Sequence, residues 1–101
     1  MTKEFTHNTS LCDILNIRYP IIMAPMFLIS NADMLIEAIN SGITGCVPAH
    51  NYRTDSQFRD AIEMIRKKAT GPIGVNLIVN KSNIKFKQQL KSCLELKIDY
   101  I

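Results

Sequence analysis

The apolar run Ile21-Ile22-Met23-Ala24-Pro25-Met26-Phe27-Leu28-Ile29 is the stretch that decides the fold of this chain. Its first four residues do not alternate with polar ones, a pattern typical of a β-strand buried on both faces, as in a parallel sheet covered by helices. A second run, Pro72-Ile73-Gly74-Val75-Asn76-Leu77-Ile78-Val79, has the same character and leads into the polar segment Asn80-Lys81-Ser82-Asn83. Both runs predict strands inside an α/β fold.

Strands of this kind recur along the chain. Their predicted starts lie near residues 21, 44, 73 and 98, with the third strand running from Ile73 to Val79 and the last only beginning at Asp99-Tyr100-Ile101. Amphipathic segments of helical period bridge each pair, so the spacing is that of a repeated βα unit. Right-handed crossovers make such units neighbours in one parallel sheet. Two architectures fit: an open doubly wound sheet, and the first three to four strands of a TIM-type barrel, that is, a partial barrel.

Short polar motifs mark the ends of the bridging helices. Ser30 or Asn31 is predicted to cap the helix that follows the first strand, and Gly42 to stop it. Thr54 or Asp55 is predicted to open the helix after the second strand. The glycine-rich G-x-G-x-x-G of dinucleotide-binding sheets does not follow the first strand, which removes the main signal for a dinucleotide site.

The composition excludes several functional classes. The chain has 101 residues, 47% of them hydrophobic, which suits one domain with a real core. Its net charge of +3 comes from dispersed lysines without interleaved aromatic residues, so no nucleic-acid partner is expected. No run approaches the roughly 20 apolar residues of a membrane-spanning helix, and no signal-peptide core follows Met1, so we expect a cytoplasmic chain without a membrane partner. Widely spaced Cys12, Cys46 and Cys93 predict free thiols and no metal site.

Three motifs, in order, carry a family resemblance. They are Tyr19-Pro20-Ile21-Ile22-Met23-Ala24-Pro25-Met26, then Gly42-Ile43-Thr44-Gly45, then Gly74-Val75-Asn76-Leu77. Together they resemble the start of the nitronate monooxygenases, formerly 2-nitropropane dioxygenases, which are FMN-dependent barrel enzymes. The segments Phe27 to Ser30, Pro48 to Thr54 and Leu77 to Asn83 resemble one branch of that family. The likeness covers about residues 12 to 101.

The resemblance implies a fold, a cofactor and a reaction. Residues 1–101 would form the amino-terminal portion of a single FMN-binding (β/α) barrel domain, incomplete as it stands. The family reaction oxidises an alkyl nitronate with FMN and O2 to a carbonyl compound and nitrite. The loops that grip the FMN phosphate and the histidine that serves as catalytic base would lie beyond residue 101. The catalytic residue is therefore not assigned, and we expect either self-association or a missing carboxyl-terminal portion.

Four residues take the family's FMN role by this resemblance: Ala24, Pro25, Met26 and Asn76. Small Ala24 and rigid Pro25 suit a flat wall beside an isoalloxazine ring, and Met26 suits packing on a ring face. Asn76 offers the donor and the acceptor that the polar edge of a flavin or its ribityl hydroxyls require. All four are predicted at or near the carboxyl ends of strands, where active sites of parallel barrels form.

Plainer interpretations stand beside these. Ala-Pro-Met also fits an ordinary strand end with a turn, and Asn76 fits a turn-forming asparagine. His50 follows the second strand, yet a lone histidine is more often structural than catalytic. Two other functions remain open: a fragment similar to flavin-dependent enoyl-acyl-carrier-protein reductase, and a non-catalytic remnant or interaction module whose open sheet edge is covered by another chain.

Overall fold

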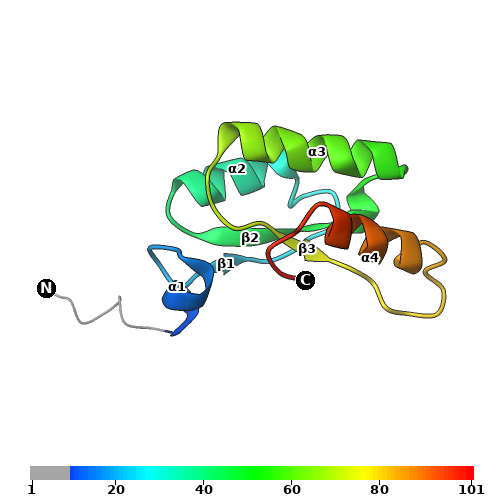
Figure 1. Cartoon of the computed structure of the whole chain (residues 1–101), viewed down its shortest axis with the longest axis horizontal. Helices are drawn as coiled ribbons and strands as arrows, with labels where there is room; N and C mark the ends of the chain where they lie inside the picture. Colours follow the sequence, from blue (N-terminus) through cyan, green and yellow to red (C-terminus); the bar gives the residue numbers. More distant parts are fainter. Residues whose placement is uncertain (1–9) are drawn as a thin grey trace, which may run out of the picture.

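The computed structural model describes residues 10–101, which build one parallel sheet with its connecting helices (Figure 1). The strands are β1 (Ile22–Met23), β2 (Thr44–Pro48) and β3 (Gly74–Asn76), and they pair in the order β1-β2-β3. Both pairings are parallel. Tyr100 forms a further parallel bridge to Gly74, so a fourth strand begins beside β3. The α/β fold and the strand spacing predicted from the sequence are confirmed.

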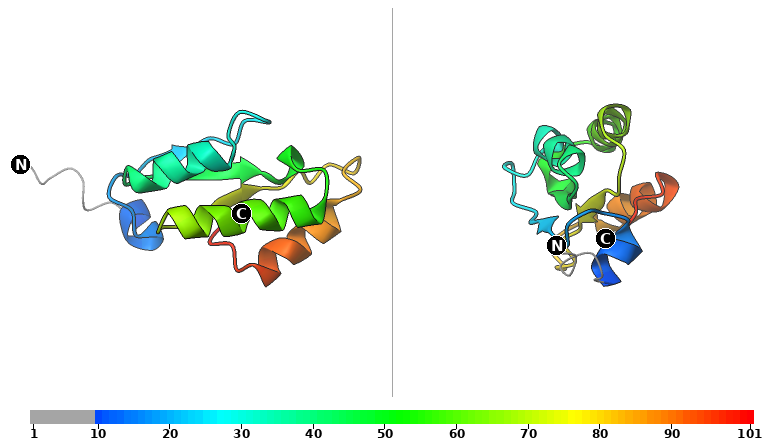
Figure 2. Two further views of the ribbon diagram at one scale, coloured as in Figure 1. Left: turned by 90° about the horizontal axis from the view of Figure 1, so that it is seen from above. Right: turned by 90° about the vertical axis from the view of Figure 1, so that its left-hand side faces the viewer.

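One helix precedes β1, and the other helices follow the strands along the chain. They are α1 (Ser10–Leu15), α2 (Ala32–Asn40), the short 3-10 turn η1 (Ala49–Asn51), α3 (Asp55–Lys68) and α4 (Phe86–Glu95). Helix α2 contacts α3, and α3 contacts α4. Figure 2 shows these three helices side by side along the sheet.

The strand order decides between the two architectures. In an open doubly wound sheet, the strand order reverses so that helices cover both faces. Here each strand lies next to its predecessor without a reversal. With right-handed crossovers, that order places every connecting helix on the same face of the sheet, as in a barrel. The partial TIM-type barrel is therefore the correct architecture.

The hydrophobic core lies between the helices and the outer face of the sheet. Val47 and Val75 project into it from β2 and β3, and they are at most 1% exposed. The helices contribute fully buried side chains such as Leu35, Ile62 and Ile65. Gly45 also faces this layer, since a Cβ there would lie 3.2 Å from a Leu35 methyl carbon. The opposite face of the sheet, which corresponds to the inside of a barrel, does not take part in this core.

The helix ends follow from local chemistry. The Asn31 side chain caps α2 by accepting a hydrogen bond from the backbone N–H of Met34, 2.9 Å away. Gly42, at φ +97°, follows the end of that helix in a conformation that a side chain would disfavour. Thr54 caps α3 through a reciprocal capping box with Gln57. These predictions are confirmed, with Asn31 and Thr54 as the caps.

Two predictions about the strands are wrong. Ile21 and Ile22 are 52% and 41% exposed, so the first strand is not buried on both faces. The reason is that, among residues 10–101, β1 pairs with β2 alone and therefore lies at an edge of the sheet. The third strand ends at Asn76 rather than Val79, which is 78% exposed, because β2 ends at Pro48 and offers no further backbone to pair with.

Two features are absent from residues 10–101. No helix among them has both the length and the apolar character needed to cross a membrane. Within the same range, His, Cys, Asp and Glu side chains do not gather in any group of three or more that would hold a metal ion.

Candidate functional site

The strand ends bring the predicted site residues to one end of the sheet. Ala24 and Pro25 directly follow β1, and Asn76 is the last residue of β3. Asn76 is paired in register with Pro48, the last residue of β2. Because parallel strands all end at the same edge, these positions lie next to one another.

A pocket of about 360 Å³ opens at these strand ends. Pro25 and Asn76 both line it, from β1 and β3 respectively. Its volume falls within the roughly 300–1,000 Å³ typical of small-molecule sites. The remaining lining residues are apolar apart from a thiol: Cys46, Val75, Leu77, Val79, Phe86, Leu90 and Ile101. Ala24 and Met26 flank Pro25 in the chain but do not line this pocket, and Met26 is 46% exposed.

The pocket contains one uncommitted polar side chain. The carboxamide of Asn76 is half-buried and makes no hydrogen bond to any part of the chain that the structure describes. Its donor and its acceptor therefore remain available to a ligand. The Cys46 thiol faces the same space, and burial raises its pKa, so it stays protonated at neutral pH.

Ser30 shapes the segment that carries Pro25. This side chain is fully buried, and its Oγ accepts a hydrogen bond from the Met26 N–H at 2.9 Å while donating one to the Ala24 carbonyl at 2.6 Å. Its two bonds thus hold the backbone on both sides of Pro25. The sequence suggested Ser30 only as a helix cap, because nothing in the residue pattern indicates a bond directed back toward the strand.

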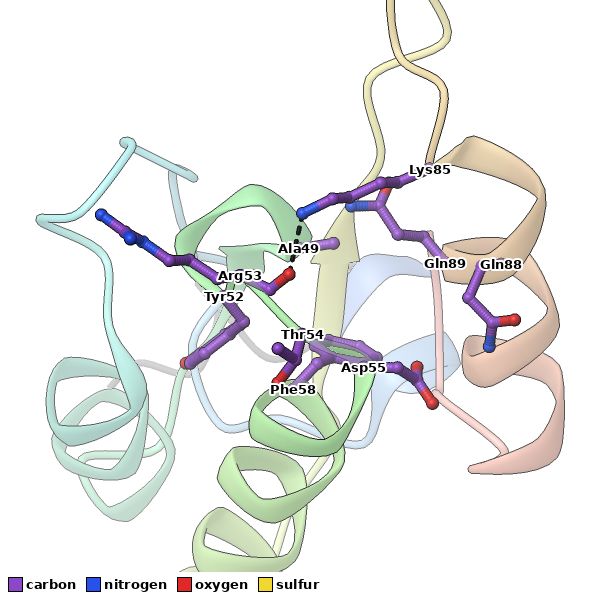
Figure 3. Close-up of a pocket in the computed structure, with 9 residues that line it drawn as sticks. All are labelled: Ala49, Tyr52, Arg53, Thr54, Asp55, Phe58, Lys85, Gln88 and Gln89. Atoms are coloured by element: carbon purple, nitrogen blue, oxygen red, sulfur yellow. Dashed lines mark hydrogen bonds between the residues drawn. The ribbon is translucent and has the colours of Figure 1, made fainter.

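A second, smaller pocket lies in the helical layer. It measures about 170 Å³ and is lined by residues from η1, α3, α4 and the segments next to them: Ala49, Tyr52, Arg53, Thr54, Asp55, Phe58, Lys85, Gln88 and Gln89 (Figure 3). The Lys85 ammonium donates to the Arg53 carbonyl at 2.8 Å. Asp55 accepts hydrogen bonds from Ser92 and from Arg59 Nε, the latter at 2.7 Å. The bond from Ser92 is the main cause that lowers the pKa of Asp55. Since Lys85 and Asp55 bond partners within the chain, we assign no ligand to this pocket.

His50 belongs to that helical layer as well. Its Nδ1 lies 3.3 Å from Nε2 of Gln89, and the Oε1 atom of Gln89 accepts a hydrogen bond from Asn83. Gln89 is only 8% exposed, so His50 satisfies a buried amide. This arrangement supports the structural interpretation of His50.

The comparisons with known proteins bear on this arrangement. The sequence model of the nitronate monooxygenase family matches residues 8–99. The chain belongs to the nitronate monooxygenase family. This is a family of flavin-dependent oxidoreductases built on a TIM barrel, and the strands described above are its first units.

One curated relative in the nitronate monooxygenase family shows the extent of the match. The probable nitronate monooxygenase of Staphylococcus haemolyticus (strain JCSC1435) is 36% identical to this chain over 73 residues. Those residues are 72% of this chain but 20% of the relative, so the match spans about a fifth of the relative's length. No solved structure matches the chain significantly.

Proposed function

We propose that this chain supplies one wall of an FMN site in an enzyme that oxidises alkyl nitronates with O2 to a carbonyl compound and nitrite. The carrying observation is the pocket shared by Pro25 and Asn76, in which the Asn76 carboxamide lacks a hydrogen-bond partner among residues 10–101. A mostly apolar pocket with one free amide suits an isoalloxazine ring, which has apolar faces and a polar edge.

Each proposed residue has a distinct task. Pro25 would pack against the ring from the end of β1, and Ala24 and Met26, which flank it outside the pocket lining, would extend this wall. Asn76 directs its amide to the polar atoms of the flavin and so fixes its orientation. When bound, FMN would supply the redox chemistry for transferring electrons from the nitronate to oxygen. The chain's apolar residues, such as Val75 and Phe86, exclude water from that side of the site.

Flavin titration of the 101-residue chain tests this proposal. No lysine or arginine lines the pocket, so it offers no cation for the FMN phosphate. We therefore expect FMN and riboflavin to bind with similar affinity, measured by the change in flavin fluorescence. Saturable binding of both supports the proposal, and an absence of binding to either would refute it. Strong preference for FMN would contradict this placement of the ring.

The Asn76→Ala variant tests the key contact. A directional hydrogen bond is worth about 0.5–1.5 kcal/mol, which corresponds to a dissociation constant weaker by roughly 2- to 13-fold. The control is Asn40→Ala, which removes the same carboxamide at the end of α2, away from the pocket, where Asn40 donates to the Lys68 carbonyl at 3.3 Å. Equal flavin affinity in the two variants would remove Asn76 from the site.

A further inference from the structure

The loop after β1 contains a strained residue. Leu28 adopts φ +64°, in the left-handed region that residues with a Cβ rarely occupy. Its side chain is 63% exposed, so packing does not explain the conformation. Strain of this kind persists only where surrounding contacts hold it, and it concentrates at functional sites.

Backbone bonds from the Ile29 and Ser30 N–H groups to the Met26 carbonyl, at 3.0 Å and 2.8 Å, close this loop, and Asn51 anchors it from the next βα unit. Its Oδ1 accepts a hydrogen bond from the Leu28 N–H at 2.6 Å, and its Nδ2 donates to the Ser30 carbonyl at 3.0 Å. Asn51 lies in η1, directly after β2, so one carboxamide ties the loop of the first βα unit to the second unit. An amide side chain can make both contacts at the same time, because it has a donor and an acceptor in one plane.

These bonds continue toward the pocket. Ser30, whose carbonyl Asn51 holds, bonds through its own hydroxyl to Ala24 and Met26 on either side of Pro25. A hydrogen-bonded path therefore runs from Asn51 through Ser30 to the segment that lines the pocket. We propose that Asn51 is a positioning residue for flavin binding: it keeps Leu28 left-handed and thereby fixes the Ala24–Met26 wall. This inference rests on the proposed function.

The first test compares Asn51→Ala with the wild-type chain and with Asn40→Ala. Two quantities are measured: the hydrogen-exchange rate of the Leu28 amide by NMR, and the dissociation constant for FMN. In Asn51→Ala we expect amide exchange faster by about tenfold or more and FMN affinity weaker by about fivefold. Neither should change in Asn40→Ala. Faster exchange with unchanged FMN affinity would overturn the proposal.

A second variant separates positioning from direct contact. Glycine adopts the left-handed conformation without steric cost, so Leu28→Gly removes the strain that Asn51 offsets. In the Asn51→Ala background, Leu28→Gly should recover at least half of the lost FMN affinity on a logarithmic scale. A double variant that binds no tighter than Asn51→Ala would overturn the positioning role.

The two hypotheses fail in different ways. A wild-type chain that binds no flavin refutes the proposed function, and the positioning role falls with it. A wild-type chain that binds flavin while Asn51→Ala binds equally well refutes the positioning role alone.

Discussion

Replacing Gly74 with alanine should displace the ring of Tyr100. A Cβ at this position would lie 2.4 Å and 2.5 Å from two ring carbons of Tyr100 and 2.8 Å from the Cys46 sulfur, all closer than real contacts allow. The ring cannot simply slide away, because its hydroxyl lies 3.0 Å from Thr44 Oγ1 and donates to the Gly45 carbonyl at 3.1 Å. Accommodation therefore costs either strain or this hydrogen bond.

The expected magnitude is similar by both routes. Overpacking of a well-packed site costs about 1–3 kcal/mol. Expelling the ring instead loses the hydrogen bond to Gly45, worth about 0.5–1.5 kcal/mol, together with part of the burial of the ring. We therefore expect Gly74→Ala to lower the free energy of unfolding by about 1–3 kcal/mol, measured by urea denaturation. In a Tyr100→Ala background only the contact with Cys46 remains, so the same substitution should cost less than half as much.

The alkaline titration of Tyr100 measures independently whether Gly74→Ala displaces the Tyr100 ring. Burial raises the pKa of Tyr100 to about 12, whereas a tyrosine in the unfolded chain titrates near pH 10. The folded state thus favours the neutral phenol, and this stabilisation is complete below about pH 10 and disappears as the pH rises to about 12. In Gly74→Ala, the pKa from phenolate absorbance should fall toward 10. An unfolding free energy within about 0.5 kcal/mol of the wild type would refute the reasoning.

Three further predictions concern the helices. Thr54→Ala removes the capping box of α3 and should lower the unfolding free energy by about 1 kcal/mol. An unchanged unfolding free energy in urea denaturation would contradict that cap. Ile62→Val should cost about 0.5–1.5 kcal/mol, because Ile62 is fully buried, whereas Ile84→Val at a 94% exposed position should be silent; equal effects would contradict the described core. Asp55→Asn should be less stable than the wild type, and the difference in unfolding free energy should be largest above about pH 4. The reason is that the hydrogen bond from Ser92 lowers the pKa of Asp55, so the ionised carboxylate stabilises the folded state until it is protonated. A difference between Asp55→Asn and wild type that is constant with pH would exclude this linkage.

The parts of the fold that were predictable depend on neighbours in the sequence. The caps at Asn31 and Thr54 and the left-handed Gly42 each follow from a few adjacent residues, and all three are confirmed. The βα period was equally clear, because each strand and helix has its own hydrophobic pattern. The burial of Ile22 and the length of the third strand were wrong, since both depend on which strands lie alongside.

The candidate site was predictable only in part. Its location at the strand ends follows from parallel topology, and the structure brings Pro25 and Asn76 to one pocket. The flavin roles of these residues, and of Ala24 and Met26, remain predictions. The Asn51 contacts had no signal in the sequence, because they join loops 21 and 23 residues apart and depend on a left-handed leucine that no residue pattern announces.

Polar side chains on the inner face of the sheet differ between its two ends: they are hydrogen-bonded within the chain where the strands start and open to a ligand where the strands end. At the starts of β2 and β3, Thr44 donates to the Pro72 carbonyl at 2.8 Å, and the Tyr100 hydroxyl donates to the Gly45 carbonyl at 3.1 Å. Every hydroxyl there is committed to holding strands together. At the other end, the Asn76 carboxamide has no such partner in residues 10–101. Stability residues at the amino-terminal end and free polar groups at the carboxyl-terminal end are the division expected of a parallel barrel enzyme, which is why we place ligand binding at Asn76 rather than at Tyr100.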